Sequence, residues 1–242
     1  MTEKPSNEIA ETVGSIMERI RLAAERAGRS PADIRLMAVT KTVPPERVNE
    51  AIAAGCDLLG ENRVQELLDK YDSYDRSGAE IHFIGHLQTN KVKYIADKVT
   101  MIESVDSVKL AQEIDRQCKK LGKSMDVLLE VNIAAEESKS GFLPEEIEQA
   151  VIEMTKFSNI NVRGLMTIGP VGAEIDETRH CFSKMRKLLV DIGGKKLDNI
   201  SMNVLSMGMS GDYEEAVEEG STIVRVGRGL FGARPQVIPA DK

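Results

Sequence analysis

The sequence predicts an α/β fold, a single (β/α)8 barrel of the TIM type with an extra N-terminal helix. Its 242 residues lie near the roughly 250 residues typical of such a barrel. Short runs of apolar and β-branched residues alternate with amphipathic stretches of helical period, which is typical of βα units in a parallel sheet. Eight such runs occur, enough strands for the sheet to close on itself.

A helix is predicted ahead of the first strand, over residues 6–28, and Gly28 supplies its C-terminal stop. Apolar side chains recur at helical spacing along one stripe, in Ile9, Val13, Ile16, Met17 and Ile20. Because this helix precedes the first strand, it is additional to the βα repeat.

The eight strands follow, with a helix predicted in each gap. The strands are expected at 35–40, 57–60, 81–84, 100–103, 126–132, 162–166, 201–206 and 223–226. The clearest helices are expected at 45–54, 107–121, 144–157 and 175–190. Several strand runs are nearly continuous in apolar or β-branched residues, as expected of strands whose outer face is covered by helices.

The main alternative architecture is an open, doubly wound sheet. It is weakened because no G-x-G-x-x-G motif follows the first strand, so a dinucleotide-binding fold is not favoured. No linker-like or low-complexity segment divides the chain. We therefore expect one domain over residues 1–242, with a loose tail from about residue 235.

Composition excludes several classes of function. The net charge of -7 argues against a nucleic acid or an anionic membrane as the main partner. The three cysteines are far apart and the three histidines bring at most two together, so neither a disulfide framework nor a metal site is expected. The N-terminus is polar and no stretch is long enough to span a membrane, which predicts a cytoplasmic protein.

Polar residues and glycines follow the predicted strands, and in a parallel barrel these positions converge on one end. Lys41 ends the first strand, where a lysine either points into water or is partly buried as a reactive amine. Burial lowers the pKa of a lysine, and a neutral amine can condense with an aldehyde. Lys41 is therefore the first candidate for chemistry.

Two glycine-rich segments predict a phosphate site. Residues 207–212 follow the seventh strand and lead into a helix, and residues 226–229 follow the eighth strand. Barrels frequently bind phosphate with these two loops, where free backbone N–H groups favour an anion. Ser210 either donates its hydroxyl to the phosphate or caps the helix, and the two roles are compatible.

Arg225 lies one residue before the end of the last strand, next to the first strand if the barrel closes. A buried arginine needs a partner. The partner is either a glutamate, Glu103 or Glu130, in an internal salt bridge, or the ring nitrogen of a cofactor. Enzymes of pyridoxal 5'-phosphate (PLP) pair a Schiff-base lysine with an Asp or Arg near the pyridine nitrogen, which matches Lys41 with Arg225.

Six segments together resemble the pyridoxal-phosphate homeostasis protein family, over about residues 10–235. They are residues 39–44, 60–66, 82–91, 164–168, 205–210 and 225–234. Members of that family are barrels similar to the N-terminal domain of alanine racemase. They hold PLP as a Schiff base and have no established catalytic turnover.

The resemblance implies that Lys41 forms the Schiff base and that Arg225 contacts the pyridine nitrogen. It implies phosphate contacts from Ser210, Gly227 and Arg228, the last two through their backbone. Asn62 and His86 are expected at the cofactor's ring or rim. The chain departs from the family at Arg228, where a small or uncharged residue is expected, so the role of that side chain stays open.

Lys139 matches a position where the family often has a lysine. It is either a second acceptor of PLP during transfer or part of a surface loop. Beyond PLP itself, PLP-dependent apoenzymes are the expected recipients, and a monomer or weak dimer is the expected state.

Three functions compete for these residues: a PLP carrier, a PLP-dependent amino-acid racemase, and a Schiff-base aldolase that uses Lys41 without a cofactor. The charged Arg225 can only donate a hydrogen bond to an unprotonated ring nitrogen, which makes the ring a weak electron sink. Racemisation also needs a second base, and Tyr213, which opens the helix after the phosphate loop, is expected to pack instead. The aldolase leaves Arg225 without a role, so the carrier is preferred.

Overall fold

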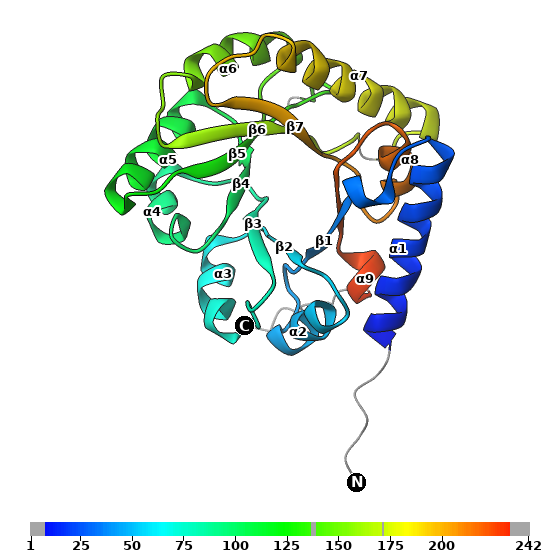
Figure 1. Ribbon diagram of the computed structural model, residues 1–242. Helices are drawn as coiled ribbons and strands as arrows, with labels where there is room; N and C mark the ends of the chain where they lie inside the picture. The colour runs from blue at the N-terminus through cyan, green and yellow to red at the C-terminus, as the bar shows by residue number, and fades with distance from the viewer. Residues whose placement is uncertain (1–7, 137–138, 171, 233–242) are drawn as a thin grey trace, which may run out of the picture.

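The fold is a closed barrel of eight parallel strands in chain order, β1 to β8, surrounded by helices (Figure 1). This computed structural model describes residues 8–136, 139–170 and 172–232. The strands span Arg35–Val39, Leu58–Glu61, Glu80–Phe83, Met101–Val105, Met125–Glu130, Ile160–Met166, Ile200–Ser206 and Ile223–Val226. The predicted barrel is confirmed, and each of the eight predicted runs overlaps one strand.

Helices fill the gaps between the strands. They are α1 Glu8–Arg26, α2 Pro45–Ala53, α3 Val64–Lys70, α4 Val92–Ile95, α5 Val108–Leu121, α6 Ile147–Met154, α7 Ile175–Gly193, α8 Tyr213–Glu218 and α9 Arg228–Phe231. Among the described residues, none of these helices is long and apolar enough to cross a membrane. The predicted loose tail from about residue 235 lies outside the described residues.

Helix α1 lies along the outside of the barrel beside α8, α9 and α2 (Figure 1). Its buried stripe is formed by Ile9, Val13, Ile16, Ile20, Ala23 and Ala24. Placing Met17 on this stripe was wrong, because its position lies at the edge of the stripe and its side chain is 43% exposed. Arg26 also pairs with Glu218 of α8 at 2.7 Å, so α1 is joined to α8 by charge as well as packing.

Alternation along each strand decides which side chains enter the barrel. Two buried clusters fill the interior, one of Met37, Val39, Leu58, Ile84 and Ile223 and one of Met101, Leu128 and Met166. A much larger cluster packs the outer face of the sheet against the helices. Strand β8 closes the barrel on β1, with Met37 opposite Arg225. Lys41, two residues beyond the inward Val39, therefore belongs to the inner face at the C-terminal end.

Candidate functional site

A cavity of about 450 Å³ opens at the C-terminal end of the barrel. Six of the seven predicted site residues line it, namely Lys41, Asn62, Ser210, Arg225, Gly227 and Arg228. His86 does not line this cavity. It lines an adjoining cavity of about 250 Å³, where its Nδ1 lies 3.1 Å from Asp106 Oδ2.

The backbone on both sides of Lys41 is fixed by hydrogen bonds. Thr40 is buried and its Oγ1 donates to Glu61 Oε1 at 2.6 Å. The backbone N–H of Thr42 donates to the Glu66 carboxylate. Thr42 has φ of +63°, a conformation that β-branched residues rarely adopt. These contacts set the direction of the chain at Lys41, which lines both the main cavity and a neighbouring one of about 190 Å³.

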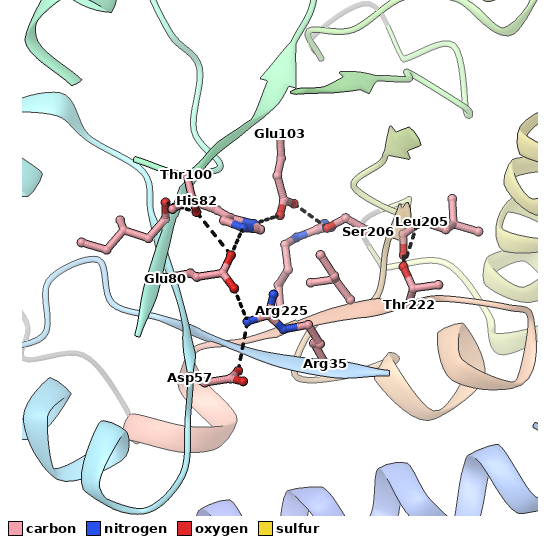
Figure 2. Close-up of polar contacts among 12 residues, drawn as sticks. Arg35, Asp57, Glu80, His82, Thr100, Glu103, Leu205, Ser206, Thr222 and Arg225 are labelled. Carbon is pink, nitrogen blue, oxygen red and sulfur yellow. Dashed lines mark hydrogen bonds and ion pairs between the residues drawn. The ribbon is translucent and has the colours of Figure 1, made fainter. Parts of the chain in front are cut away.

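Arg225 is 5% exposed and reaches its partners inside the barrel. Its Nη1 donates to Ser206 Oγ at 2.8 Å and its Nη2 donates to the carbonyl oxygen of Thr167 at 2.7 Å. Ser206 in turn donates to Glu103 Oε2 at 2.6 Å (Figure 2). A direct salt bridge from Arg225 to Glu103 was the alternative from sequence, and the structure instead inserts the Ser206 hydroxyl between them.

The polar network continues down the barrel interior (Figure 2). His82 Nδ1 lies 2.7 Å from Glu103 Oε1, and its Nε2 lies 3.6 Å from Glu80. Glu80 lies 3.1 Å from Arg35, whose Nη2 also pairs with Asp57 at 3.2 Å. Charges of opposite sign therefore alternate from the cavity to the opposite end of the barrel.

Buried charges in this network stabilise one another. Burial alone lowers the pKa of His82, but its hydrogen bonds with Glu103 and Glu80 outweigh that effect and raise the pKa. Burial alone raises the pKa of Glu103, but the hydrogen bond and charge of His82 outweigh it and lower the pKa. Burial lowers the pKa of Arg225, yet a guanidinium titrates so far above neutrality that it stays charged.

A hydrogen bond joins the two glycine-rich loops. The backbone N–H of Gly229 donates to Ser210 Oγ at 3.0 Å. Ser210 therefore does not cap α8. The residue at that cap is Asp212, whose carboxylate accepts from the backbone N–H of Met209 at 2.5 Å. With its oxygen used as an acceptor, the Ser210 hydroxyl hydrogen can still point at a bound anion.

Glycine is required in the first of these loops. Gly208 has φ of +90°, and a Cβ there would lie 2.4 Å from the Cβ of Ala216. Helix α9 begins at Arg228, inside the second glycine-rich segment, and the sequence pattern did not predict it. The Arg228 side chain is exposed at its start, between the main cavity and the 190 Å³ cavity.

Asn62 carries a buried oxygen without a donor. Within the described part of the chain, its Oδ1 has no hydrogen-bond partner. Asn62 lines both the main cavity and the 250 Å³ cavity. An unsatisfied buried acceptor is costly, so this atom is suited to receive a donor from a ligand.

Sequence reasoning missed the acidic residues near Arg225. Glu130 and Glu103 entered only as alternatives, and Asp212 only as the start of a helix, although Asp212 lines the main cavity. The signal was available for Glu103 and Glu130, since both alternate with inward apolar residues on their strands. His82 is a core histidine whose polar group is satisfied, since it is 1% exposed and its Nδ1 lies 2.7 Å from Glu103 Oε1.

Tyr213 is 4% exposed and packs under α1, with the Arg19 guanidinium 5.3 Å from the centre of its ring. It is not among the residues that line the main cavity. The expectation that Tyr213 packs in the structure is therefore confirmed.

Comparison with known proteins gives a consistent picture. The family model described as alanine racemase, N-terminal domain, matches residues 12–235. A protein of Aquifex aeolicus named pyridoxal phosphate homeostasis protein is 44% identical over 224 residues, which cover 93% of this chain and 97% of that protein.

Solved structures agree in fold. PipY of Synechococcus elongatus, in a structure with PLP bound, is 32% identical with a TM-score of 0.81, covering 93% of this chain and all of the other. Alanine racemase of Clostridium difficile is 20% identical with a TM-score of 0.70, and the similarity covers 96% of this chain but 57% of the racemase. At that identity the racemase shares the fold alone.

Proposed function

Because this chain belongs to the pyridoxal phosphate homeostasis protein family, we propose that it binds pyridoxal 5'-phosphate as a Schiff base on Lys41 and holds it for other proteins. One observation carries the proposal. The amine of Lys41, the guanidinium of Arg225 and the two glycine-rich loops all border one cavity of about 450 Å³. The PLP bound to the related PipY supports the same cofactor here.

The groups around the cavity fit PLP. The cavity is within the range of roughly 300–1,000 Å³ that small-molecule sites occupy. Ser210, Gly227 and the backbone of Arg228 would bind the phosphate, and Arg225 would face the ring nitrogen. The buried Asn62 Oδ1, which lacks a donor among the described residues, is an acceptor that such a ligand can satisfy.

Carriage without sustained turnover follows from the same residues. PLP supplies an electron sink when its ring nitrogen is protonated, and a permanently charged Arg225 can donate to that nitrogen but cannot protonate it. Among the described residues no tyrosine lines the main cavity. A racemase remains the second candidate, because the fold is shared with alanine racemase. The cofactor-free aldolase explains Lys41 but gives Arg225 no role.

The first prediction is that Lys41 carries the cofactor. Purified protein incubated with PLP should absorb visible light. Borohydride reduction followed by peptide mapping should then place the pyridoxyl mass on the peptide that contains Lys41, and Lys41→Ala should lose both signals. Pyridoxyl mass found on Lys139 alone would contradict the assignment.

Four further expectations from the sequence stay predictions. They are delivery of PLP to PLP-dependent apoenzymes, a monomeric or weakly dimeric state, a cytoplasmic location and a single domain over residues 1–242. Transfer is tested by mixing the loaded chain with a PLP-dependent apoenzyme across a size barrier that passes only free PLP. Faster activation when the two proteins share one compartment would support direct transfer.

A further inference from the structure

The 250 Å³ cavity beside the main one is built from the residues at the ends of β2, β3 and β5 and from Lys139 and Ser140. It is lined by Asn62, His86, Glu130 and Lys139, among others. Asn62, Ile84 and Ile168 border both cavities, so the two are contiguous. A group that enters the smaller cavity is thus next to the space that Lys41 borders.

Glu130 is the last residue of β5 and belongs to its inner face, two residues after the inward Leu128. Its side chain lines the small cavity, and the residue is 9% exposed. Its backbone carbonyl oxygen already accepts a hydrogen bond, from the N–H of Phe142 at 2.8 Å. Its carboxyl group makes no hydrogen bond or ion pair with any residue in 8–136, 139–170 and 172–232.

The nearby donors contact other acceptors. Lys139 Nζ donates to Glu136 Oε1 at 2.6 Å and to Gly169 O at 3.1 Å. His86 is paired with Asp106. Among the described residues, two acceptors at this cavity lack a hydrogen-bond partner, Asn62 Oδ1 and the Glu130 carboxyl group. A ligand that satisfies both must bring several N–H donors, and a positive charge would match Glu130.

Charged groups surround Glu130 from several elements. Asp106 follows β4, His86 follows β3, Arg225 lies on β8, Lys139 lies in the loop after β5, and Glu103 lies one layer deeper on β4. Burial and the charge of Asp106 raise the pKa of Glu130 to about 7, while Arg225 and His86 partly offset them. Near neutral pH the carboxyl group can therefore both accept and return a proton.

We propose that this cavity is a subsite for a primary ammonium group, and that Glu130 takes a proton from that group before the amine reaches the carbon bound to Lys41. The proposal rests on the proposed function and specifies what receives the cofactor. The ammonium group belongs either to a free amino acid or to a lysine side chain of a recipient protein.

The proton and bond balance closes within these residues. The ammonium gives one proton to the Glu130 carboxylate and becomes a neutral amine with a free lone pair. If Lys41 Nζ holds the cofactor through a carbon–nitrogen double bond, the incoming nitrogen would take over that double bond and Lys41 Nζ would be released. The two protons left on the incoming nitrogen and the one held by Glu130 would pass to Lys41 Nζ, so Glu130 would end as a carboxylate and Lys41 as an ammonium.

The first test uses the chain without cofactor, so it does not depend on PLP binding. Calorimetry would measure binding of L-alanine and of Nα-acetyl-L-lysine to the wild type, to Glu130→Gln and to the control Glu113→Gln, whose carboxylate pairs with Arg116 on the outside of α5. We expect saturable binding that tightens from pH 6 to pH 8, is at least about tenfold weaker in Glu130→Gln and is unchanged in Glu113→Gln. The probe that binds identifies the source of the ammonium.

A second measurement uses the loaded chain. The absorbance change after the amine is added should be slowed about 10²-fold or more in Glu130→Gln, the scale of general acid–base catalysis. Equal amine binding and equal rates in wild type and Glu130→Gln would overturn the subsite. If the wild type does not bind PLP on Lys41, the proposed function is contradicted. The calorimetry of the cofactor-free chain would still test the subsite in that case. Far-UV circular dichroism would show whether Glu130→Gln folds. If it does not, the pH dependence of amine binding to the wild type still tests the subsite.

Discussion

At the scale of single residues, the buried charge of Arg225 depends on its neighbours. A guanidinium that is 5% exposed loses its hydration, and Ser206 and the Thr167 carbonyl replace it. Glu103 balances the charge through Ser206 without contacting Arg225. The guanidinium is thereby held at the cavity wall.

Arg225→Ala should loosen PLP and leave the Ser206 hydroxyl and the Thr167 carbonyl without their donor. We expect a loss of roughly 1–3 kcal/mol in the free energy of unfolding. Urea denaturation and retention of PLP through gel filtration measure the two effects. The exposed Arg228 provides a control, because Arg228→Ala should leave the unfolding free energy nearly unchanged. Unaltered PLP retention and stability in Arg225→Ala would contradict its place in the site.

The pair of His82 and Glu103 should make stability depend on pH. Folding raises the pKa of His82, so its contribution is complete below the unfolded pKa of about 6.5 and is lost as the pH rises through the folded pKa. Folding lowers the pKa of Glu103, so its contribution is lost as the pH falls below about 4.5. His82→Gln should therefore be most destabilising, by about 3–5 kcal/mol, between these limits.

Urea denaturation of wild type and His82→Gln at a series of pH values tests this. The difference in unfolding free energy should be largest near pH 5.5 and should shrink above pH 7. A difference that does not change with pH would mean that His82 is neutral in the folded protein.

At the scale of elements, the proposed phosphate site consists of two loops that a hydrogen bond holds together. Ser210 after β7 accepts from Gly229 after β8, and α8 starts three residues beyond Ser210. Helix α1 braces α8 from outside through Arg26 and Glu218. Neither loop is long, so the geometry of the proposed anion site follows from the positions of the two strands.

Ser210→Ala should weaken PLP binding more than pyridoxal binding, because only PLP has the phosphate that the loops address. We expect a change of roughly 1 kcal/mol, or several-fold, in the ratio of the two affinities. Fluorescence or absorbance titration with both compounds measures it, and the exposed Ser158→Ala serves as a control. Equal affinities for the two compounds in the wild type would show that the phosphate site is misplaced.

At the scale of the whole molecule, the barrel gathers distant residues at one end, and α1 and α8 close its outer ring beside β8 (Figure 1). The same closure brings β8 against β1, so that Arg225 and Lys41 border one cavity although they lie far apart in sequence. The cavity is thus lined by a lysine, residues of the two glycine-rich loops and a fixed cation, with no tyrosine from the described residues.

Loaded protein should exchange its cofactor with amino acids slowly and show no sustained turnover. A second general base typically contributes about 10²–10⁴-fold, and Tyr213 is buried under α1, away from the cavity. Deuterium exchange at the α-carbon of L-alanine and chiral analysis of the product measure any reaction. Multiple turnovers that Lys41→Ala abolishes would make this chain a racemase.

The sequence by itself determined the barrel and most of the cavity wall. Hydrophobic period and strand count predicted the fold, because alternating βα units have few other ways to bury their faces. Positions after the strands then predicted Lys41, Asn62, Ser210 and Arg225 at one end, since parallel strands share a direction.

Only the tertiary structure decided what those side chains touch. In the structure, Ser206 lies between Arg225 and Glu103, and Ser210 accepts a hydrogen bond from Gly229. His86 lines the adjoining cavity together with Glu130. These contacts join residues from different strands, and their partners depend on the stagger of neighbouring strands around the closed barrel. Local patterns show which side chains point inward, but the stagger that sets their height along the barrel axis is fixed only when all eight strands have paired.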